Sequence, residues 1–302
     1  MTSSFDTIPR IGFGVGTSWY NNARGEDLTA LGVKNALLAG YKLIDDAEMY
    51  QNEVSVGKGI SSYLDDSTKS RSNIWITSKV HASISTRGVA GIKEAALESL
   101  QKLGHSLKGY FDLYLLHAPF NSDGSPFKES LPSLWRAMED LVEKGIAHRI
   151  GVSNFRSTDL RNMMSEGVKI KPYCNQIERH PSLLQPELTK TCKDLGIKIV
   201  AYGPLVPLTF SGAGVKVRAT AETIASSRVD KTTAAQILLS HALVYSDAIV
   251  TTTSKVERLP ESLSAENIVL TLDEIAQLDA AGKDEPLRKF WHAKQCPSVI
   301  WD

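Results

Sequence analysis

The sequence predicts a single α/β domain over residues 1–302, folded as a (β/α)8 TIM barrel with an extra C-terminal tail, and three observations support this. Short, almost continuous apolar runs alternate with amphipathic stretches, which is typical of parallel strands covered by helices on both faces. Eight such runs can be counted, the number that closes this kind of barrel. No linker-like or low-complexity segment divides the chain, and α/β barrels of this length form one domain.

The predicted strands are short and rich in apolar and β-branched residues. In chain order they read RIGFGV (10–15), KLIDDA (42–47), IWITSKV (74–80), FDLYLLHA (111–118), RIGVSN (149–154), YCNQIE (173–178), KIVAYG (198–203) and AIVTTT (248–253).

The segments between these strands carry helical patterns. Residues 89–104 place Val89, Ile92, Ala96, Leu100 and Leu103 on one face, and Gly104 is suited to end that helix. Residues 131–145 repeat this pattern and end at Gly145. We expect residues 206–220 to be an inserted loop and residues 284–302 to form a tail over one end of the barrel.

A doubly wound dinucleotide-binding sheet is the alternative fold. It requires G-x-G-x-x-G after the first strand. The sequence GFGVGTSW offers Gly12, Gly14 and Gly16, but Thr17 stands where the third glycine of the motif belongs. A turn of small residues is therefore the better interpretation.

Charge and hydropathy argue against several classes of function. The 34 Lys and Arg residues balance 34 Asp and Glu residues, so no basic excess favours nucleic acid or an anionic membrane. No apolar run approaches the roughly 18 residues of a membrane span, and the first residues lack a signal-peptide pattern. Cys174, Cys192 and Cys296 lack metal or redox spacing. We expect free thiols in a cytoplasmic protein, no metal site, and a monomer, because no additional apolar surface is evident.

Polar side chains stand at the C-terminal ends of seven predicted strands. In a barrel of this type these ends converge on one mouth, where active sites are built. The residues are Asp45, Lys79, His117, Ser153, Asn154, Gln176, Tyr202, Thr252, Thr253 and Ser254. Each alone has an ordinary structural explanation: a carboxylate or hydroxyl can cap a helix, a lysine can be solvated, and a histidine can be a satisfied core residue. Their occurrence together at one end favours a functional site.

These groups suit the protonation of a carbonyl oxygen. A carboxylate at Asp45 keeps a buried Lys79 charged, and that ammonium should lower the pKa of a neighbouring phenol. Tyr50, one short loop after the second predicted strand, is then the proton donor, and His117 orients the substrate oxygen. No nucleophile elbow, metal cluster or paired-carboxylate site is evident. Hydride from a nicotinamide is therefore the most economical partner for the carbonyl carbon.

The motifs LIDDAEMYQNE, ITSKV, LLHAP, IGVSNF, NQIERHP and AYGPL occur in an order and spacing that resemble the aldo-keto reductase family. The resemblance spans nearly the whole chain, from RIGFGVGTSW to EPLRKFW. It implies that Asp45, Tyr50, Lys79 and His117 form a catalytic tetrad and that the cofactor is NADPH. It also implies that Ser153, Asn154 and Gln176 hold the nicotinamide amide and that Tyr202 stacks on the ring.

The resemblance extends to further cofactor and substrate residues. The remaining implied cofactor residues are Thr17, Trp19, Leu205, Thr252, Thr253, Ser254, Lys255 and Arg258. The implied substrate residues are Trp19, His81, Ala118, Phe120, Phe290 and Trp291.

Several positions depart from the family pattern. Thr252-Thr253 replaces the usual Lys-Ser, and Ser262 replaces a usual asparagine, although Lys255 and Arg258 remain to meet a 2′-phosphate. Ala118 and His81 stand where many members have aromatics, which suggests a roomier pocket unless Phe120 or the tail fills it.

The segments TTTSKVER and EPLRKFW resemble fungal reductases of α-keto amides and of conjugated polyketones such as ketopantoyl lactone. The leading expectation is thus an NADPH-dependent reductase of small carbonyl substrates. A non-catalytic, cofactor-binding regulatory subunit and an NAD-dependent sugar or polyol dehydrogenase are the alternatives.

Overall fold

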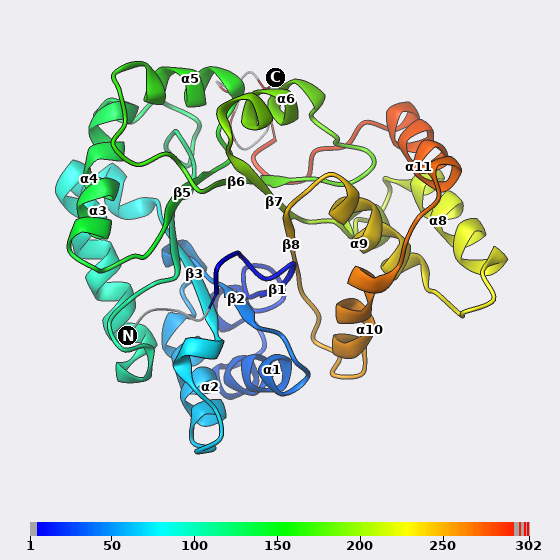
Figure 1. Cartoon of the computed structure of the whole chain (residues 1–302), viewed down its shortest axis with the longest axis horizontal. Coiled ribbons are helices and arrows are strands. Elements are labelled where there is room, and N and C mark those ends of the chain that lie inside the picture. Colours follow the sequence, from blue (N-terminus) through cyan, green and yellow to red (C-terminus); the bar gives the residue numbers. More distant parts are fainter. Residues whose placement is uncertain (1–4, 293–295, 297–298, 300, 302) are drawn as a thin grey trace.

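The computed structural model of the chain describes residues 5–292, 296, 299 and 301. Eight parallel strands close into a barrel in sequence order, with the last strand hydrogen-bonded to the first, which confirms the predicted (β/α)8 barrel (Figure 1). The strands are β1 (Ile11–Gly14), β2 (Leu43–Asp45), β3 (Trp75–Val80), β4 (Leu113–Leu116), β5 (Ile150–Ser153), β6 (Cys174–Glu178), β7 (Lys198–Tyr202) and β8 (Ala248–Thr251).

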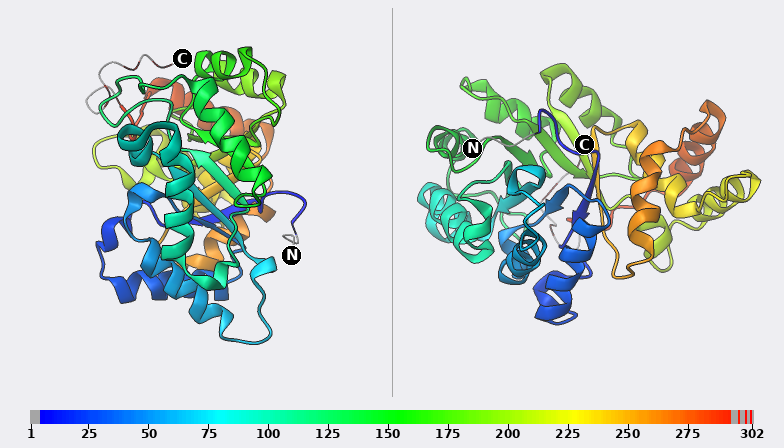
Figure 2. Two further views of the ribbon diagram at one scale, coloured as in Figure 1. Left: turned by 90° about the vertical axis from the view of Figure 1, so that its left-hand side faces the viewer. Right: turned by 60° about the horizontal axis from the view of Figure 1, so that its bottom comes forward.

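Helices surround the barrel on all sides in the two further views of Figure 2. They are α1 (Glu26–Leu38), α2 (Glu53–Leu64), α3 (Ala82–Leu103), α4 (Leu131–Glu143), α5 (Ser157–Ser165), α6 (Pro186–Leu195), α7 (Val206–Thr209), α8 (Val215–Ser227), α9 (Ala234–Val244), α10 (Arg258–Ser264) and α11 (Leu272–Asp284). Single turns of 3-10 helix are η1 (Tyr20–Asn22), η2 (Glu48–Tyr50), η3 (Arg71–Asn73), η4 (His105–Leu107) and η5 (Ala265–Asn267).

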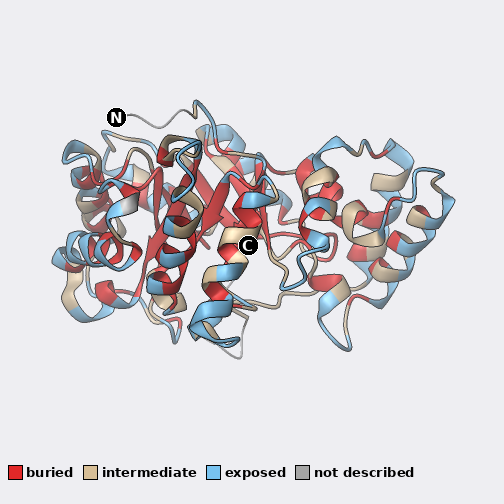
Figure 3. Cartoon of the chain, turned by 90° about the horizontal axis from the view of Figure 1, so that it is seen from below, coloured by how far each residue is buried: buried red, intermediate tan, exposed pale blue. Residues whose placement is uncertain are grey.

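The core has two layers because side chains alternate between the faces of each strand. Leu43, Trp75 and Leu115 belong to an apolar cluster inside the barrel, whereas Ile44 and Ile76 belong to the cluster between the barrel and its helices. Figure 3 shows this as buried strands covered by helices whose outer faces are exposed.

The same alternation decides which of two adjacent carboxylates reaches the mouth. Asp45 has the parity of Leu43 and faces the barrel interior. Asp46 has the parity of Ile44 and lies toward α2, where burial and then the charge of Glu53 raise the pKa of Asp46 well above its ordinary value.

Two local predictions were wrong. Residues 206–220 are not one loop, because they contain α7 and the start of α8; Val217, from this segment, packs on α9 and α11 through residues such as Ile237 and Leu278. The predicted helix is present, because α3 continues to Leu103 after an interruption at Gly88, which has a φ of 62°, but its predicted buried face was wrong at one position. Val89 itself is exposed, while the other four predicted apolar residues of that face are buried.

Other features of the chain agree with the sequence. Helix α3 ends at Leu103, directly before Gly104. The three cysteines are buried free thiols. None of the helices within the described ranges is long and apolar enough to cross a membrane.

Candidate active site

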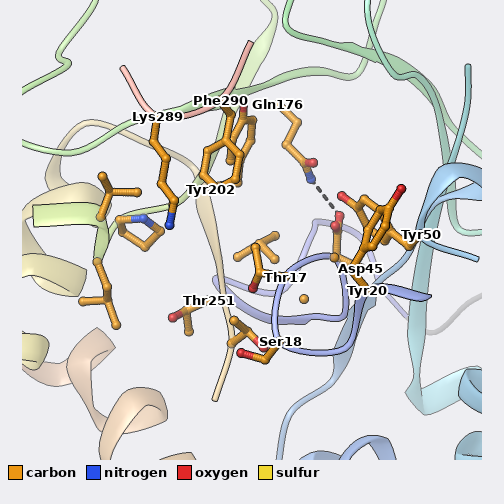
Figure 4. A pocket seen from close by; sticks show the side chains of 18 of the residues that line it. Thr17, Ser18, Tyr20, Asp45, Tyr50, Gln176, Tyr202, Thr251, Lys289 and Phe290 are labelled. Atoms are coloured by element: carbon orange, nitrogen blue, oxygen red, sulfur yellow. Dashed lines mark hydrogen bonds between the residues drawn. The ribbon is translucent and has the colours of Figure 1, made fainter. Parts of the chain in front are cut away.

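A cavity of about 770 Å³ opens at the C-terminal end of the barrel. Its walls come from the strand ends and from the loops that follow β1, β2, β4, β7 and β8, with the tail residues Lys289, Phe290 and Trp291 closing one side. Figure 4 shows Asp45 and Tyr50 on one side of the cavity and Lys289 on the other. Three of the four predicted catalytic residues, Asp45, Tyr50 and His117, line it.

Lys79 lies fully buried behind this wall. Its ammonium donates hydrogen bonds to Asp45 Oδ1 at 2.6 Å and to the Asp46 carbonyl oxygen at 2.9 Å. Burial opposes the charge, but Asp45 and then Tyr50 outweigh it and raise the pKa of Lys79 above its ordinary value. The other Asp45 oxygen accepts a hydrogen bond from Gln176 Nε2 at 2.7 Å. The carboxylate is therefore held from both sides, and Lys79 is a fixed positive charge.

Tyr50 sits on η2, directly after β2, with its hydroxyl 3.5 Å from Lys79 Nζ. The turn is tied to α3 because the Glu48 carboxylate accepts hydrogen bonds from the backbone N–H groups of His81 at 2.8 Å and Ser83 at 3.1 Å. A Cβ on Gly16 would lie 2.5 Å from Tyr50 Cζ, so the turn after β1 needs glycine there to let the ring approach.

The expected lowering of the Tyr50 pKa is wrong in its net direction. Burial raises the pKa of Tyr50 to about 12, although the charge of Lys79 acts in the opposite sense as predicted. The increase in pKa caused by desolvation is larger than the decrease caused by the Lys79 ammonium at 3.5 Å. The phenol therefore keeps its proton at neutral pH, as a proton donor must.

His117 completes the arrangement from the end of β4. Its ring lies 5.7 Å from the Tyr50 ring in an edge-to-face contact. Burial, and then the charge of Lys79, hold the pKa of His117 well below its usual range. The imidazole is thus neutral and can offer one N–H to an oxygen in the cavity without carrying charge.

A chain of amide and hydroxyl groups lines the floor. Tyr202 donates from its hydroxyl to Asn154 Oδ1 at 2.7 Å, and Asn154 Nδ2 donates to the His117 carbonyl oxygen at 2.8 Å. These bonds hold Asn154 at a φ of 60°, which is unusual for a residue other than glycine. Of the three residues predicted to hold a nicotinamide amide, Asn154 and Gln176 line the cavity. Ser153 is buried beneath, with its hydroxyl on the Gln176 carbonyl oxygen at 2.8 Å.

Several predicted pocket residues lie elsewhere. Trp19 is buried beside α1, and a Cβ on Gly32 would lie 2.7 Å from its ring, so it packs on a helix rather than lining the cavity. Ala118 and Phe120 lie in a separate apolar cluster with Cys296 and Val299 of the tail. The space expected beside Ala118 is therefore filled by the tail, which was the alternative explanation, and Ala118 does not widen the cavity.

His81 also stays behind the wall. It is buried, with Nε2 2.9 Å from the Phe120 carbonyl oxygen. Its ring touches that of Trp291, with centroids 5.4 Å apart. Trp291 and Phe290 do line the cavity.

The remaining predicted cofactor residues fall into two groups, one inside the cavity and one outside it. Thr17, Leu205 and Thr252 line the cavity. Thr253 and Ser254 follow outside it. Lys255 and Arg258 are exposed at the start of α10, and neither forms an ion pair within the described ranges.

Sequence reasoning missed some wall residues. Thr251, Met49, Ser18 and Thr209 line the cavity, and so does Lys289, a cation of the tail. The EPLRKFW segment was recognised as a motif and supplied Phe290 and Trp291, but Lys289 could be assigned only once the path of the segment over the barrel was known.

The cavity suits a nicotinamide nucleotide. Its volume lies in the range of sites for small molecules and cofactors. Thr252 Oγ1 and His117 Nδ1 are buried without a hydrogen-bond partner in the described part of the chain. Both residues line the cavity, and Thr252 is one of the predicted cofactor residues. Asn154, Gln176 and Tyr202 would hold the nicotinamide end. No group of three His, Cys, Asp or Glu side chains among the described residues is placed to bind a metal ion.

Comparisons with known proteins agree with this geometry. The model of the aldo/keto reductase family matches residues 10–283. A protein of Schizosaccharomyces pombe named NAD/NADP-dependent indole-3-acetaldehyde reductase is 38% identical over 289 residues, covering 94% of this chain and 95% of that protein. The NADPH-dependent D-xylose reductase of Meyerozyma guilliermondii is 29% identical, over 89% of this chain and 91% of its own length.

Solved structures show the same similarity. An aldose reductase of Giardia lamblia superposes with a TM-score of 0.83 at 26% identity, covering 99% of this chain and 100% of that one. A Bombyx mori aldo-keto reductase in complex with NADP also gives a TM-score of 0.83, at 28% identity over 96% of this chain and 94% of that chain.

Proposed function

Because the chain belongs to the aldo/keto reductase family, and is thus an oxidoreductase that reduces carbonyl groups with NAD(P)H, we propose that it converts an aldehyde or activated ketone to the alcohol, with NADPH as the preferred cofactor. Tyr50 is the general acid, assisted by Lys79, Asp45 and His117. The observation that carries this proposal is the Tyr50 hydroxyl at the cavity wall, 3.5 Å from a buried ammonium.

The chemistry follows from that geometry. When bound, the nicotinamide supplies hydride to the carbonyl carbon. Tyr50 gives its proton to the carbonyl oxygen, and the nearby Lys79 charge stabilises the phenolate that remains. Asp45 keeps Lys79 charged and fixed, and Gln176 fixes Asp45. Neutral His117 orients the substrate oxygen by a hydrogen bond, and the buried surroundings strengthen each of these interactions.

We assign the preference for NADPH to Lys255 and Arg258. Both are exposed cations without an ionic partner in the described ranges. Lys255 follows the cavity residue Thr252 by three positions, and Arg258 follows Lys255 by three more. Arginine is suited to a phosphate because its planar fork donates two hydrogen bonds. The relative from S. pombe carries both cofactors in its name, which makes discrimination between them a quantity to measure.

The lining of the cavity is consistent with a substrate that is an apolar or conjugated carbonyl compound. Phe290, Trp291, Leu205 and Val206 give the cavity an apolar side. α-Keto amides, conjugated diketones and ketolactones therefore belong on the candidate list beside aldehydes. The width once inferred from Ala118 gives no preference for a ketolactone, because the tail covers that residue.

The test is consumption of NADPH and of NADH with a panel of aldehydes, α-keto amides, diketones and ketolactones. We expect turnover with at least one activated carbonyl compound and a higher kcat/KM for NADPH. Tight cofactor binding without turnover of any compound would indicate a regulatory cofactor-binding subunit. A higher kcat/KM for NAD with polyols would indicate a dehydrogenase.

A further inference from the structure

The tail that walls the cavity is held by one buried carboxylate. Glu178, the last residue of β6, is fully buried. Its Oε1 accepts a hydrogen bond from the backbone N–H of Lys289 at 2.9 Å, and its Oε2 accepts one from the N–H of Phe290, also at 2.9 Å. His180 Nε2 lies 3.1 Å from Oε1. Both carboxylate oxygens are thus directed at the tail.

The residues that follow β6 hold the tail as well. Leu287 donates its N–H to the Ser182 carbonyl oxygen at 3.1 Å. Arg288 donates a hydrogen bond to Gln185 Oε1 at 3.0 Å, and Gln185 Nε2 donates one to the Glu178 carbonyl oxygen at 2.7 Å. We call Glu178, His180, Ser182 and Gln185 the tail anchor. It binds four consecutive tail residues, 287–290, and within the anchor it is Glu178 that accepts the backbone hydrogen bonds of residues 289 and 290 of the cavity wall.

The anchored residue Phe290 and the next residue, Trp291, contact two residues of the site. The Phe290 ring meets the Tyr202 ring edge-to-face at 5.6 Å between centroids. The Trp291 ring lies 6.1 Å from the ring of His117. A shift of the tail backbone would therefore move the apolar wall relative to Tyr50 and His117, which hydrogen-bond to the carbonyl oxygen. A misplacement of the substrate by about 1 Å can slow a reaction markedly.

We propose that Glu178 is a positioning residue for the substrate: by holding the backbone of Lys289 and Phe290, it sets the distance between the apolar wall and the catalytic groups. This rests on the proposed function. A carboxylate suits the task because it accepts two charge-assisted hydrogen bonds at once. A glutamine offers one acceptor oxygen and turns an NH2 group toward the second N–H, which is then left buried and unpaired.

A matched control lies elsewhere in the barrel. Glu139 of α4 is also buried, and its carboxylate accepts hydrogen bonds from the consecutive N–H groups of Lys169 at 2.7 Å and Ile170 at 2.9 Å. None of these three residues lines the cavity. Both of its bonds use Oε1, so Glu139→Gln can keep them, whereas Glu178→Gln must lose one.

The experiment compares Glu178→Ala and Glu178→Gln with Glu139→Ala and Glu139→Gln. We expect Glu178→Ala to raise the KM of the carbonyl substrate by about 10-fold, with Glu178→Gln between it and wild type. Neither Glu139 variant should change that KM. Limited trypsin digestion reports on the tail directly, because Arg288 and Lys289 are cleavage sites. Cleavage there should accelerate only in the Glu178 variants.

Two results would overturn the proposal. One is a carbonyl KM that stays constant although trypsin shows the tail released. The other is the same KM change in the Glu139 variants, which would reveal a general effect of stability. If Glu178→Ala fails to fold, Glu178→Gln provides the same readouts. A wild-type protein that turns over no carbonyl compound would refute the proposed function instead, while digestion would still test the anchor.

Discussion

Replacing Tyr50 with phenylalanine should remove the proton donor while leaving the cavity intact. The hydroxyl has one hydrogen bond in the described structure, from Lys79 at 3.5 Å, and Lys79 keeps its bonds to Asp45 and the Asp46 carbonyl oxygen. Loss of that contact should cost at most about 0.5–1.5 kcal/mol of unfolding free energy. The ring remains to pack on Gly16 and His117.

The rate should fall far more than the stability. A positioned general acid contributes roughly 10²- to 10⁴-fold, which is about 2.7–5.4 kcal/mol of activation free energy. We expect this loss in kcat for NADPH consumption, whereas the NADPH Kd, measured from quenching of tryptophan fluorescence, should be unchanged. Turnover near the wild-type value would refute the assignment of Tyr50. An equal loss of cofactor affinity would show that the hydroxyl binds the nucleotide instead.

The pH dependence tests the same group. Because the folded pKa of Tyr50 is about 12, above an unfolded value of about 10, its protonated form adds stability that is fully present below about pH 10. That contribution is lost as the pH rises through 12. Urea unfolding should show this alkaline loss in wild type and a smaller one in Tyr50→Phe. Identical alkaline profiles would contradict the burial argument.

Three further substitutions test other parts of the site. Lys79→Met should abolish turnover and lower the unfolding free energy by about 3–5 kcal/mol, because it leaves the buried Asp45 carboxylate unpaired; an unchanged urea midpoint would contradict this. Arg258→Ala should weaken NADPH by about 1.5–3 kcal/mol and leave NADH unaffected in fluorescence titrations; equal losses would show a structural role. Ala118→Trp should overpack the cluster of Phe120, Cys296 and Val299, costing about 1–3 kcal/mol in thermal or urea unfolding; an unchanged stability would place Ala118 at open space after all.

The strands and the order of the barrel could be predicted because their signal is local. Apolar runs of six to eight residues, separated by helical patterns, are visible without tertiary contacts, and the parallel topology follows from their alternation. The same regularity placed Asp45, Lys79 and His117 at one mouth. It also separates Asp45 from Asp46, since residues one apart on a strand face opposite sides.

The rest depended on contacts between distant segments. Ala118 is small in sequence, but only the path of the tail shows that Cys296 and Val299 cover it. The sign of the Tyr50 pKa shift depended on how deeply the ring is buried, which composition does not reveal. Glu178 reads as an ordinary strand residue because its partners lie 111 and 112 positions away along the chain.

The bonds between Glu178 and the tail restrict how this barrel can be re-engineered. Glu178 accepts its hydrogen bonds from backbone N–H groups rather than from side chains at positions 289 and 290, so these two bonds are compatible with most amino acids in a tail exchanged between relatives. Proline is the exception, because it has no N–H to donate. A chimera whose incoming tail aligns proline with either position would lose one of the two hydrogen bonds to Glu178, however well its other side chains suited the new substrate.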